Sequence, residues 1–145
     1  MADQRDAVAP APVLVVEDDP DTRELLQTTL EAEGLAVATA ADGQAALRWL
    51  DRQRPALLLL DLSLPDLRGE DLAKVAQARY GPALPVLVVT GASQAQHRAS
   101  AAGSLVYLAK PFELATLVGI VTALLAPAAP DAAAPSSDPP AARAD

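Results

Sequence analysis

Five short apolar runs recur along the chain and predict the strands of a sheet. They cover residues 13–16, 35–39, 57–60, 86–89 and 105–108. Three of these runs are almost wholly apolar, which is typical of strands that are covered on both faces. Successive runs start roughly 20–30 residues apart, which leaves room for one strand and one crossover helix in each repeat.

The segments between the runs carry helix signals. Asp19 and Pro20 predict an N-cap followed by proline at the first helical position, and Gly34 predicts the end of that helix. Asp42 predicts the cap of a second helix, and Gly69 opens a third. The predicted apolar faces are Leu25, Leu26, Thr29 and Leu30, then Ala46, Leu47 and Leu50, then Leu72, Val75 and Ala76, and finally Leu114, Leu117, Val118, Val121, Leu124 and Leu125.

A fourth helix is predicted between the last two strands, with Ser93 as its candidate cap. Its apolar positions are only Ala95, Ala99 and Ala102, so we expect it to be the least firmly anchored element. Strands and helices therefore alternate as (βα)₅. Right-handed crossovers then predict a doubly wound, five-stranded parallel sheet with helices on both faces.

Composition limits the chain to one folded domain. It has 145 residues, of which 51% are hydrophobic. Residues 127–145 are rich in Ala and Pro and predict a disordered tail, residues 1–10 predict a flexible N-terminus, and the folded domain is expected over 11–126. There is no Cys and one His, which excludes thiolate sites and multi-histidine metal sites. The one His, His97, is interpreted as a solvated surface residue.

The charge balance restricts the partners. The net charge of −8 does not favour nucleic acid or an anionic membrane surface, so neither is expected as a partner. The longest apolar run, 114–126, is shorter than the roughly 20 residues that a spanning helix needs. The acidic N-terminus does not resemble a signal peptide. We therefore expect a cytoplasmic protein.

Polar residues follow four of the five predicted strands. The ligands of an open α/β sheet bind beyond the carboxyl ends of its strands. The second strand is followed by Ala, which predicts a place for it at the border of the sheet. The residues at the other strand ends are Glu17, Asp18 and Asp19, then Asp61, then Thr90 and Gly91, then Lys110.

These residue types indicate a phosphoryl-accepting aspartate. Clustered carboxylates repel one another and attract a cation, and oxygen donors without His or Cys favour Mg²⁺. Lys110 and Thr90 offer donors for phosphoryl oxygens. A carboxylate such as Asp61 can itself act as the nucleophile. Asp19 is interpreted as a helix cap rather than a metal ligand.

The chain resembles the receiver domain of two-component response regulators. The resemblance implies a flavodoxin-like sheet with strand order 2-1-3-4-5. It extends over the whole 11–126 region in the right order. It rests on residues 13–20 (VLVVEDDP), 41–47 (ADGQAAL), 60–69 (LDLSLPDLRG), 89–90 (VT) and 107–112 (YLAKPF).

The resemblance implies a role for each acidic residue. Asp61 would accept the phosphoryl group from a phosphohistidine on a histidine kinase or a histidine phosphotransfer protein. Asp18, the carboxylate of Asp61 and the backbone carbonyl of Ser63 would bind Mg²⁺. Glu17 would help through a metal-bound water.

The resemblance also implies how the phosphoryl group is held and sensed. Lys110 would pair with Asp61 and then with the phosphoryl oxygens, while Thr90 would hydrogen-bond the phosphoryl group. Backbone N–H groups of Ser63 and Gly91 would assist. Tyr107 occupies the aromatic switch position of the fifth strand, with Thr90 as its partner in the switch.

The predicted function is that of a stand-alone receiver that signals through protein contacts or passes the phosphoryl group onward. It is not expected to be an enzyme beyond assisting its own phosphorylation and dephosphorylation. Two alternatives stay open: a scaffold that binds partners regardless of phosphorylation, and a receiver fragment of a hybrid histidine kinase. A hydrolase of the haloacid dehalogenase type is disfavoured, because its nucleophile follows the first strand whereas Asp61 follows the third.

Overall fold

A computed structural model describes residues 11–91 and 106–126 of the chain. The predicted fourth helix near Ser93, His97, the flexible N-terminus 1–10 and the disordered tail 127–145 lie outside the described residues. Those predictions therefore remain predictions.

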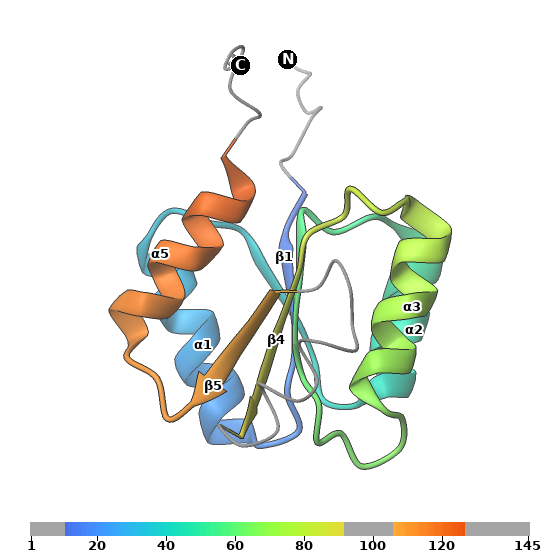
Figure 1. The fold of residues 1–145 in the computed structure, drawn as a ribbon, viewed down its shortest axis with the longest axis horizontal. Helices are drawn as coiled ribbons and strands as arrows, with labels where there is room; N and C mark the ends of the chain where they lie inside the picture. The colour runs from blue at the N-terminus through green and yellow to red at the C-terminus, as the bar shows by residue number, and fades with distance from the viewer. Residues whose placement is uncertain (1–10, 92–105, 127–145) are drawn as a thin grey trace, which may run out of the picture.

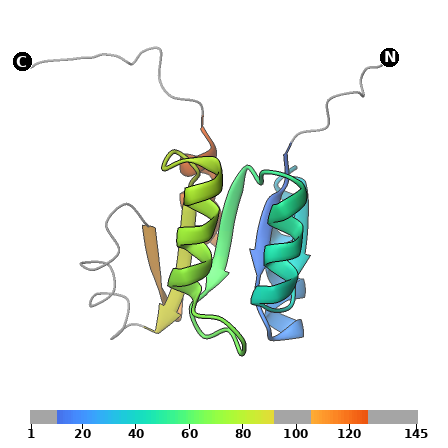
Figure 2. The ribbon, with the colours of Figure 1, turned by 90° about the vertical axis from the view of Figure 1, so that its right-hand side faces the viewer.

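The described residues form a parallel sheet between two layers of helices (Figures 1 and 2). The strand order β2-β1-β3-β4-β5 confirms the predicted doubly wound α/β fold. Strand β2, which is followed by alanine rather than by polar residues, lies at one border of the sheet, as predicted. The strands are β1 (Val13–Val16), β2 (Val37–Ala40), β3 (Leu57–Asp61), β4 (Val86–Gly91) and β5 (Val106–Lys110). The helices are α1 (Pro20–Ala32), α2 (Gly43–Arg52), α3 (Gly69–Tyr80) and α5 (Leu114–Leu125).

Four strands end later than their apolar runs predicted. The second strand covers Val37–Ala40 instead of 35–39, the third continues to Asp61, the fourth to Gly91 and the fifth to Lys110. The apolar pattern ends one or two residues earlier, but backbone pairing does not depend on side-chain hydropathy. Asp61 pairs with Val89 in register, and Gly91 pairs with Lys110. The polar residues at these ends are thus held by the sheet itself.

Two apolar cores lie on the two faces of the sheet. Strand residues alternate between the faces, so neighbours in β1 and β3 serve different cores. One core packs α2 and α3 against side chains such as Leu14 and Leu58, and the other packs α1 and α5 against side chains such as Val15 and Leu59. Strands β1 and β3 are fully buried, as their nearly unbroken apolar runs predicted.

The predicted helix caps are present in the structure. The Asp19 side chain accepts a hydrogen bond from the Thr22 N–H at the start of α1, and Asp42 accepts one from the Ala45 N–H at the start of α2. Gly34 has φ +85° shortly after α1, a conformation that favours glycine and helps to end the helix.

Two predicted core positions are wrong. Leu25 on α1 is 49% exposed and Val75 on α3 is 46% exposed. Each lies at the edge of its helix's apolar face, where helical spacing alone cannot decide burial. The buried positions of these helices include Leu26 and Ala73.

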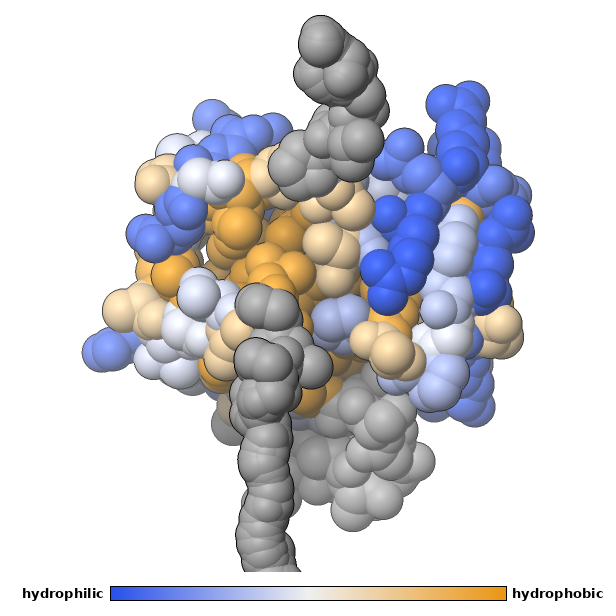
Figure 3. Space-filling view, turned by 90° about the horizontal axis from the view of Figure 1, so that it is seen from above, coloured by the Kyte–Doolittle hydropathy of each residue, from blue (hydrophilic) through white to orange (hydrophobic). Residues whose placement is uncertain are grey.

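The surface at the amino ends of the strands has an apolar part and a hydrophilic part (Figure 3). Seen from above, apolar side chains gather over the centre and left, while the side of α2 and α3 is mostly hydrophilic (Figure 3). The sequence explains part of this division, because α5 contains no charged residue whereas α2 contains three, Arg48, Asp51 and Arg52. Within 11–91 and 106–126, no helix has both the length and the hydropathy that a membrane crossing requires.

Gly69 is packed beneath the β3–α3 connection and has no room for a side chain. A Cβ at this position would lie 2.7 Å from Leu60 Cδ1 and 2.9 Å from the backbone Cα of Leu62. Because a backbone atom is one of the neighbours, a side-chain rotation cannot relieve the contact.

We therefore expect Gly69→Ala to lower the free energy of unfolding by about 1–3 kcal/mol, as overpacking does. Gly119→Ala is the matched control, since a Cβ at this position of α5 meets nothing within 4 Å. It should raise the free energy of unfolding by about 0.5–1 kcal/mol through helix propensity. Urea denaturation measures both values, and a Gly69→Ala protein as stable as the unchanged chain would contradict the packing described here.

Candidate functional site

The carboxyl ends of the strands meet at one edge of the sheet, at the bottom of Figure 1. Strands β1, β3, β4 and β5 are neighbours in the order β1-β3-β4-β5, so their final residues lie side by side. The structure thus brings together the predicted residues of all four strand ends.

Three carboxylates form a compact group at this edge. Glu17 and Asp18 follow β1, and Asp61 ends β3. One carboxylate oxygen from each residue lies within 4.8 Å of the other two. Glu17 and Asp61 are only 4% and 5% exposed, whereas Asp18 faces solvent. Like charges at this separation disfavour one another in the absence of a cation.

The carboxylate of Asp61 is oriented by two donors. Lys110 Nζ donates to Oδ2 at 2.9 Å, and the Ser63 N–H donates to Oδ1 at 2.9 Å. The Lys110 side chain is 40% exposed while Asp61 is buried, so the ion pair connects the interior to the surface. The peptide bond between Lys110 and Pro111 is cis.

The turn after β1 is held by an arginine that the sequence patterns did not single out. Arg23 on α1 donates from Nη1 to the carbonyl oxygen of Glu17 at 2.9 Å and to that of Asp18 at 3.4 Å. The Asp19 N–H donates to Glu17 Oε2 at 3.2 Å. Asp19 itself serves as the predicted cap of α1, so its carboxylate is engaged away from the acidic group.

The remaining predicted residues lie on β4 and β5. Thr90 is 1% exposed near the carboxyl end of β4, one residue beyond the register partner of Asp61. Gly91 is exposed and pairs with Lys110. Tyr107 lies on β5 opposite Val88, is half-buried and packs against the core on the side of α2 and α3.

The pKa values of two of these groups are both raised, for different physical reasons. Burial raises the pKa of Glu17 from 4.5 to about 7; the Asp19 N–H lowers it in part, and the negative charge of Asp61 raises it. Burial alone would lower the pKa of Lys110, but the hydrogen bond and the charge of Asp61 outweigh it and raise that pKa above its ordinary value. The site therefore contains a firmly protonated lysine beside a glutamate that takes up a proton when no cation compensates it.

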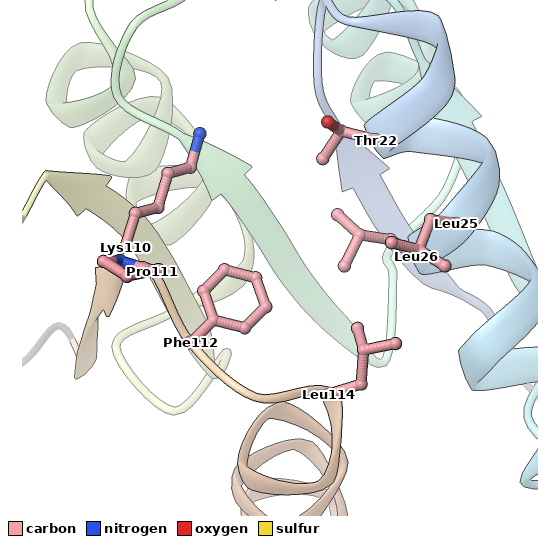
Figure 4. A pocket seen from close by; sticks show the side chains of 7 residues that line it. All are labelled: Thr22, Leu25, Leu26, Lys110, Pro111, Phe112 and Leu114. Carbon is pink, nitrogen blue, oxygen red and sulfur yellow. The ribbon is translucent and has the colours of Figure 1, made fainter.

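A pocket of about 450 Å³ opens beside Lys110, between α1 and the start of α5 (Figure 4). Its walls are mainly apolar and include the exposed side chain of Leu25. The complete lining is Thr22, Leu25, Leu26, Lys110, Pro111, Phe112 and Leu114.

The donor set fits Mg²⁺. The acidic group offers oxygen atoms only, the donor type that Mg²⁺ prefers, and these atoms lie within 4.8 Å of one another. Exposure of Asp18 leaves the site open to the waters that Mg²⁺ retains. Burial of Glu17 and Asp61 adds a reason for a cation here, because buried carboxylates need compensation.

The chain also matches a known protein family. The family model described as the response regulator receiver domain matches residues 13–122. The chain belongs to this family.

Curated relatives of the receiver domain differ in length. An uncharacterized protein of 14.6 kDa from Leptolyngbya boryana is 37% identical over 123 residues, covering 83% of this chain and 94% of the relative. Response regulator MprA from Mycobacterium leprae is 38% identical over 126 residues, covering 86% of this chain and 55% of that protein. The chain thus spans about half the length of MprA.

Solved structures with the same fold include a putative response regulator and the receiver domain of a sensor histidine kinase. A putative response regulator from Chloroflexus aurantiacus has a TM-score of 0.73 and 34% identity, covering 81% of this chain and 98% of that one. The receiver domain of sensor histidine kinase PA1611 from Pseudomonas aeruginosa has a TM-score of 0.71 and 32% identity with the same coverage. That structure contains a magnesium ion coordinated in its active site cleft.

The raised pKa of Glu17 predicts how the stability of this receiver domain depends on pH without divalent cations. The folded state binds the Glu17 proton more tightly than the unfolded chain, whose glutamate titrates near 4.5. The stabilisation is therefore complete below pH 4.5 and is lost as pH rises through about 7. The loss should be of the order of 3 kcal/mol.

Urea denaturation between pH 4.5 and 7.5 in the presence of a chelator measures this slope. Glu17→Gln should flatten it, because the amide has no proton to release. An unchanged slope in Glu17→Gln would assign the pH dependence to another group.

Proposed function

We propose that this receiver domain accepts a phosphoryl group on Asp61 from a phosphohistidine of a histidine kinase or a histidine phosphotransfer protein, in a reaction that depends on Mg²⁺. The observation that carries the proposal is the double orientation of the Asp61 carboxylate by Lys110 and the Ser63 N–H, beside two further acids. A buried carboxylate held in this way is presented as a nucleophile at the open edge of the sheet.

The transfer exchanges one bond to phosphorus for another. A carboxylate oxygen of Asp61 forms the new O–P bond as the N–P bond of the donor breaks, and the electron pair of that bond returns to the imidazole. The Nζ of Lys110, 2.9 Å from Asp61 Oδ2, can follow the charge onto the phosphoryl oxygens. Thr90 and the Gly91 N–H supply further donors from the end of β4.

Asp18, the Asp61 carboxylate and the backbone carbonyl of Ser63 would hold Mg²⁺, and Glu17 would hold it through a water. The ion supplies positive charge against the phosphoryl oxygens when it is bound. The three acidic side chains gather within 4.8 Å, which supports this assignment. The magnesium ion in the PA1611 receiver domain supports it as well.

Thr90 and Tyr107 would report the phosphorylated state. Thr90 lies near the acceptor end of β4, and Tyr107 lies on the adjacent strand at the register position two residues before the partner of Thr90. A shift of Thr90 toward a phosphoryl group on Asp61 would change the space available to the half-buried Tyr107 ring. Signalling would then proceed through protein contacts or onward phosphotransfer, in the cytoplasm.

The scaffold alternative uses the same fold but does not require the charged site. A partner-binding surface alone would require neither the buried acids at the strand ends nor the Lys110 that compensates them. The fragment alternative is compatible with the same site, since the PA1611 receiver domain of a sensor histidine kinase holds magnesium in its active site cleft. The phosphorylation chemistry that we propose is the same in either case.

We expect acetyl phosphate with Mg²⁺ to add one phosphoryl group to the chain, and Asp61→Asn to abolish the addition, because an amide is a far weaker nucleophile. Intact-mass spectrometry gives the readout. Asp19→Asn is the matched control, since asparagine also caps helices and Asp19 is engaged with Thr22 rather than with the acidic group. Undiminished labelling of Asp61→Asn would place the acceptor elsewhere.

We also propose that the phosphohistidine donor docks over the pocket beside Lys110. The pocket adjoins the reacting edge, and Leu25 presents an exposed apolar side chain at its rim (Figure 4). A donor protein must approach this edge to bring its imidazole to Asp61, so an apolar surface there can bind it. The net charge of −8 favours a donor surface with basic residues around the apolar contact.

Leu25→Glu should therefore slow transfer from a phosphohistidine donor protein by about tenfold while leaving labelling by acetyl phosphate unchanged. Val75→Glu is the control, because Val75 is equally exposed, 46% against 49%, but lies on α3 away from the pocket. The rates are measured by phosphotransfer assays with both donors. Equal rates for the two variants with the donor protein would contradict this docking surface.

A further inference from the structure

The metal-binding and nucleophile-orienting roles of Ser63 depend on a connection, residues 62–68, that belongs to neither a strand nor a helix. Ser63 is exposed and is held at one end by its hydrogen bond to Asp61. At the other end, Arg68 and Gly69 begin α3. What fixes the middle of the connection therefore decides where the main chain of Ser63 lies.

Asp66 ties the middle of this connection to the N-terminus of α2. Its Oδ1 accepts a hydrogen bond from the Gly43 N–H at 2.8 Å, and its Oδ2 accepts one from the Gln44 N–H at 2.9 Å. The partners are 22 and 23 residues apart in the sequence, so the contact is tertiary. Both acceptors meet N–H groups that have no intrahelical partner, at the positive end of the helix dipole.

A second contact closes the connection onto α2. Leu67 lies directly over Gly43, where a Cβ would be 2.5 Å from Leu67 Cδ1 and 2.8 Å from Leu67 Cβ. Glycine at position 43 therefore permits the close approach that places Gly43 and Gln44 within reach of the Asp66 carboxylate. The hydrogen bond from Gly43 also lowers the pKa of Asp66 below its ordinary value, so the carboxylate stays ionised at neutral pH.

We propose that Asp66 is a positioning residue for the metal site. By fastening residues 62–68 to α2, it holds the Ser63 carbonyl toward the acidic group and the Ser63 N–H on Asp61. This inference rests on the proposed function, because it presupposes that Mg²⁺ binds at Glu17, Asp18 and Asp61.

The physical reason is the entropy of the connection. Asp66 lies five positions after Asp61 and three positions after Ser63, so it fastens a short connection close to the carbonyl ligand. If the connection is fastened before the ion arrives, the carbonyl ligand loses little conformational freedom on binding. If it is released, that freedom must be lost when the ion binds, and the affinity falls. Partners outside the ligand set commonly change metal affinity by about 10–100-fold.

A simpler role for Asp66 is to cap α2 and nothing more. The chain contains a matched residue that separates the two roles. Asp42 caps the same helix end through the Ala45 N–H at 2.8 Å, and this hydrogen bond does not involve the connection. Loss of either carboxylate removes a cap from α2, whereas loss of Asp66 also releases residues 62–68.

The experiment compares Asp66→Ala, Asp66→Asn and Asp42→Ala with the unchanged chain. Isothermal titration calorimetry measures Mg²⁺ affinity, and urea denaturation without Mg²⁺ measures stability. We expect Asp66→Ala to weaken Mg²⁺ binding by about tenfold, and Asp66→Asn to weaken it less because its amide keeps one acceptor oxygen. Asp42→Ala should lose comparable stability and keep its Mg²⁺ affinity.

Amide hydrogen exchange gives a second readout that does not depend on the ion. The Ser63 amide should exchange faster in Asp66→Ala than in Asp42→Ala.

The outcomes distinguish this inference from the function on which it rests. If the unchanged chain binds no Mg²⁺, the proposed function fails. If it binds Mg²⁺ and the two alanine variants have equal affinities, Asp66 is only a helix cap and the positioning role is wrong. If Asp66→Ala does not fold, Asp66→Asn against Asp42→Ala decides in the same way, since asparagine retains part of the contact.

Discussion

The ion pair between Lys110 and Asp61 is the interaction on which the rest of the site depends. Two nearly buried carboxylates, Glu17 and Asp61, lie at the carboxyl edge of the sheet with Asp18 beside them. Such a group is stable only if positive charge compensates it, and the lysine compensates it from one side. Burial still raises the pKa of Glu17, although the charge of Lys110 lowers it, so the lysine does not fully offset the cost of the buried carboxylates. A divalent cation would supply the remaining positive charge.

The backbone around these charged side chains is held by strand pairing and by side-chain hydrogen bonds. Strand pairing extends to Asp61, Gly91 and Lys110, so the sheet fixes three of the four strand ends that meet there. The connections between strands and helices are then fastened by side chains on neighbouring helices. Arg23 holds the turn after β1 through its carbonyl oxygens, and α2 holds residues 62–68 through the Asp66 carboxylate. In the proposal made here, affinity for an ion would therefore depend on residues that do not touch it.

Much of this could be predicted from the sequence, because the relevant signals are local or periodic. Unbroken apolar runs predicted the buried strands, Asp19 and Asp42 predicted their helix caps, and the Ala-flanked second strand predicted the border of the sheet. Burial at the edge of a helical face was not predictable in the same way, as Leu25 and Val75 show.

The contacts of Arg23 and Asp66 were missed for a different reason. Asp66 meets its partners across more than 20 residues of sequence, and Arg23 meets carbonyl oxygens, which leave no trace in the side-chain pattern.

We propose that the acids, Lys110 and Thr90 form one phosphoryl-accepting centre. A crystal structure with Mg²⁺ and beryllofluoride tests it most directly. We expect the ion on Asp18, Asp61 and the Ser63 carbonyl, and the beryllofluoride on Asp61 in contact with Lys110 and Thr90. An ion or a beryllofluoride group bound away from Asp61 would contradict the account.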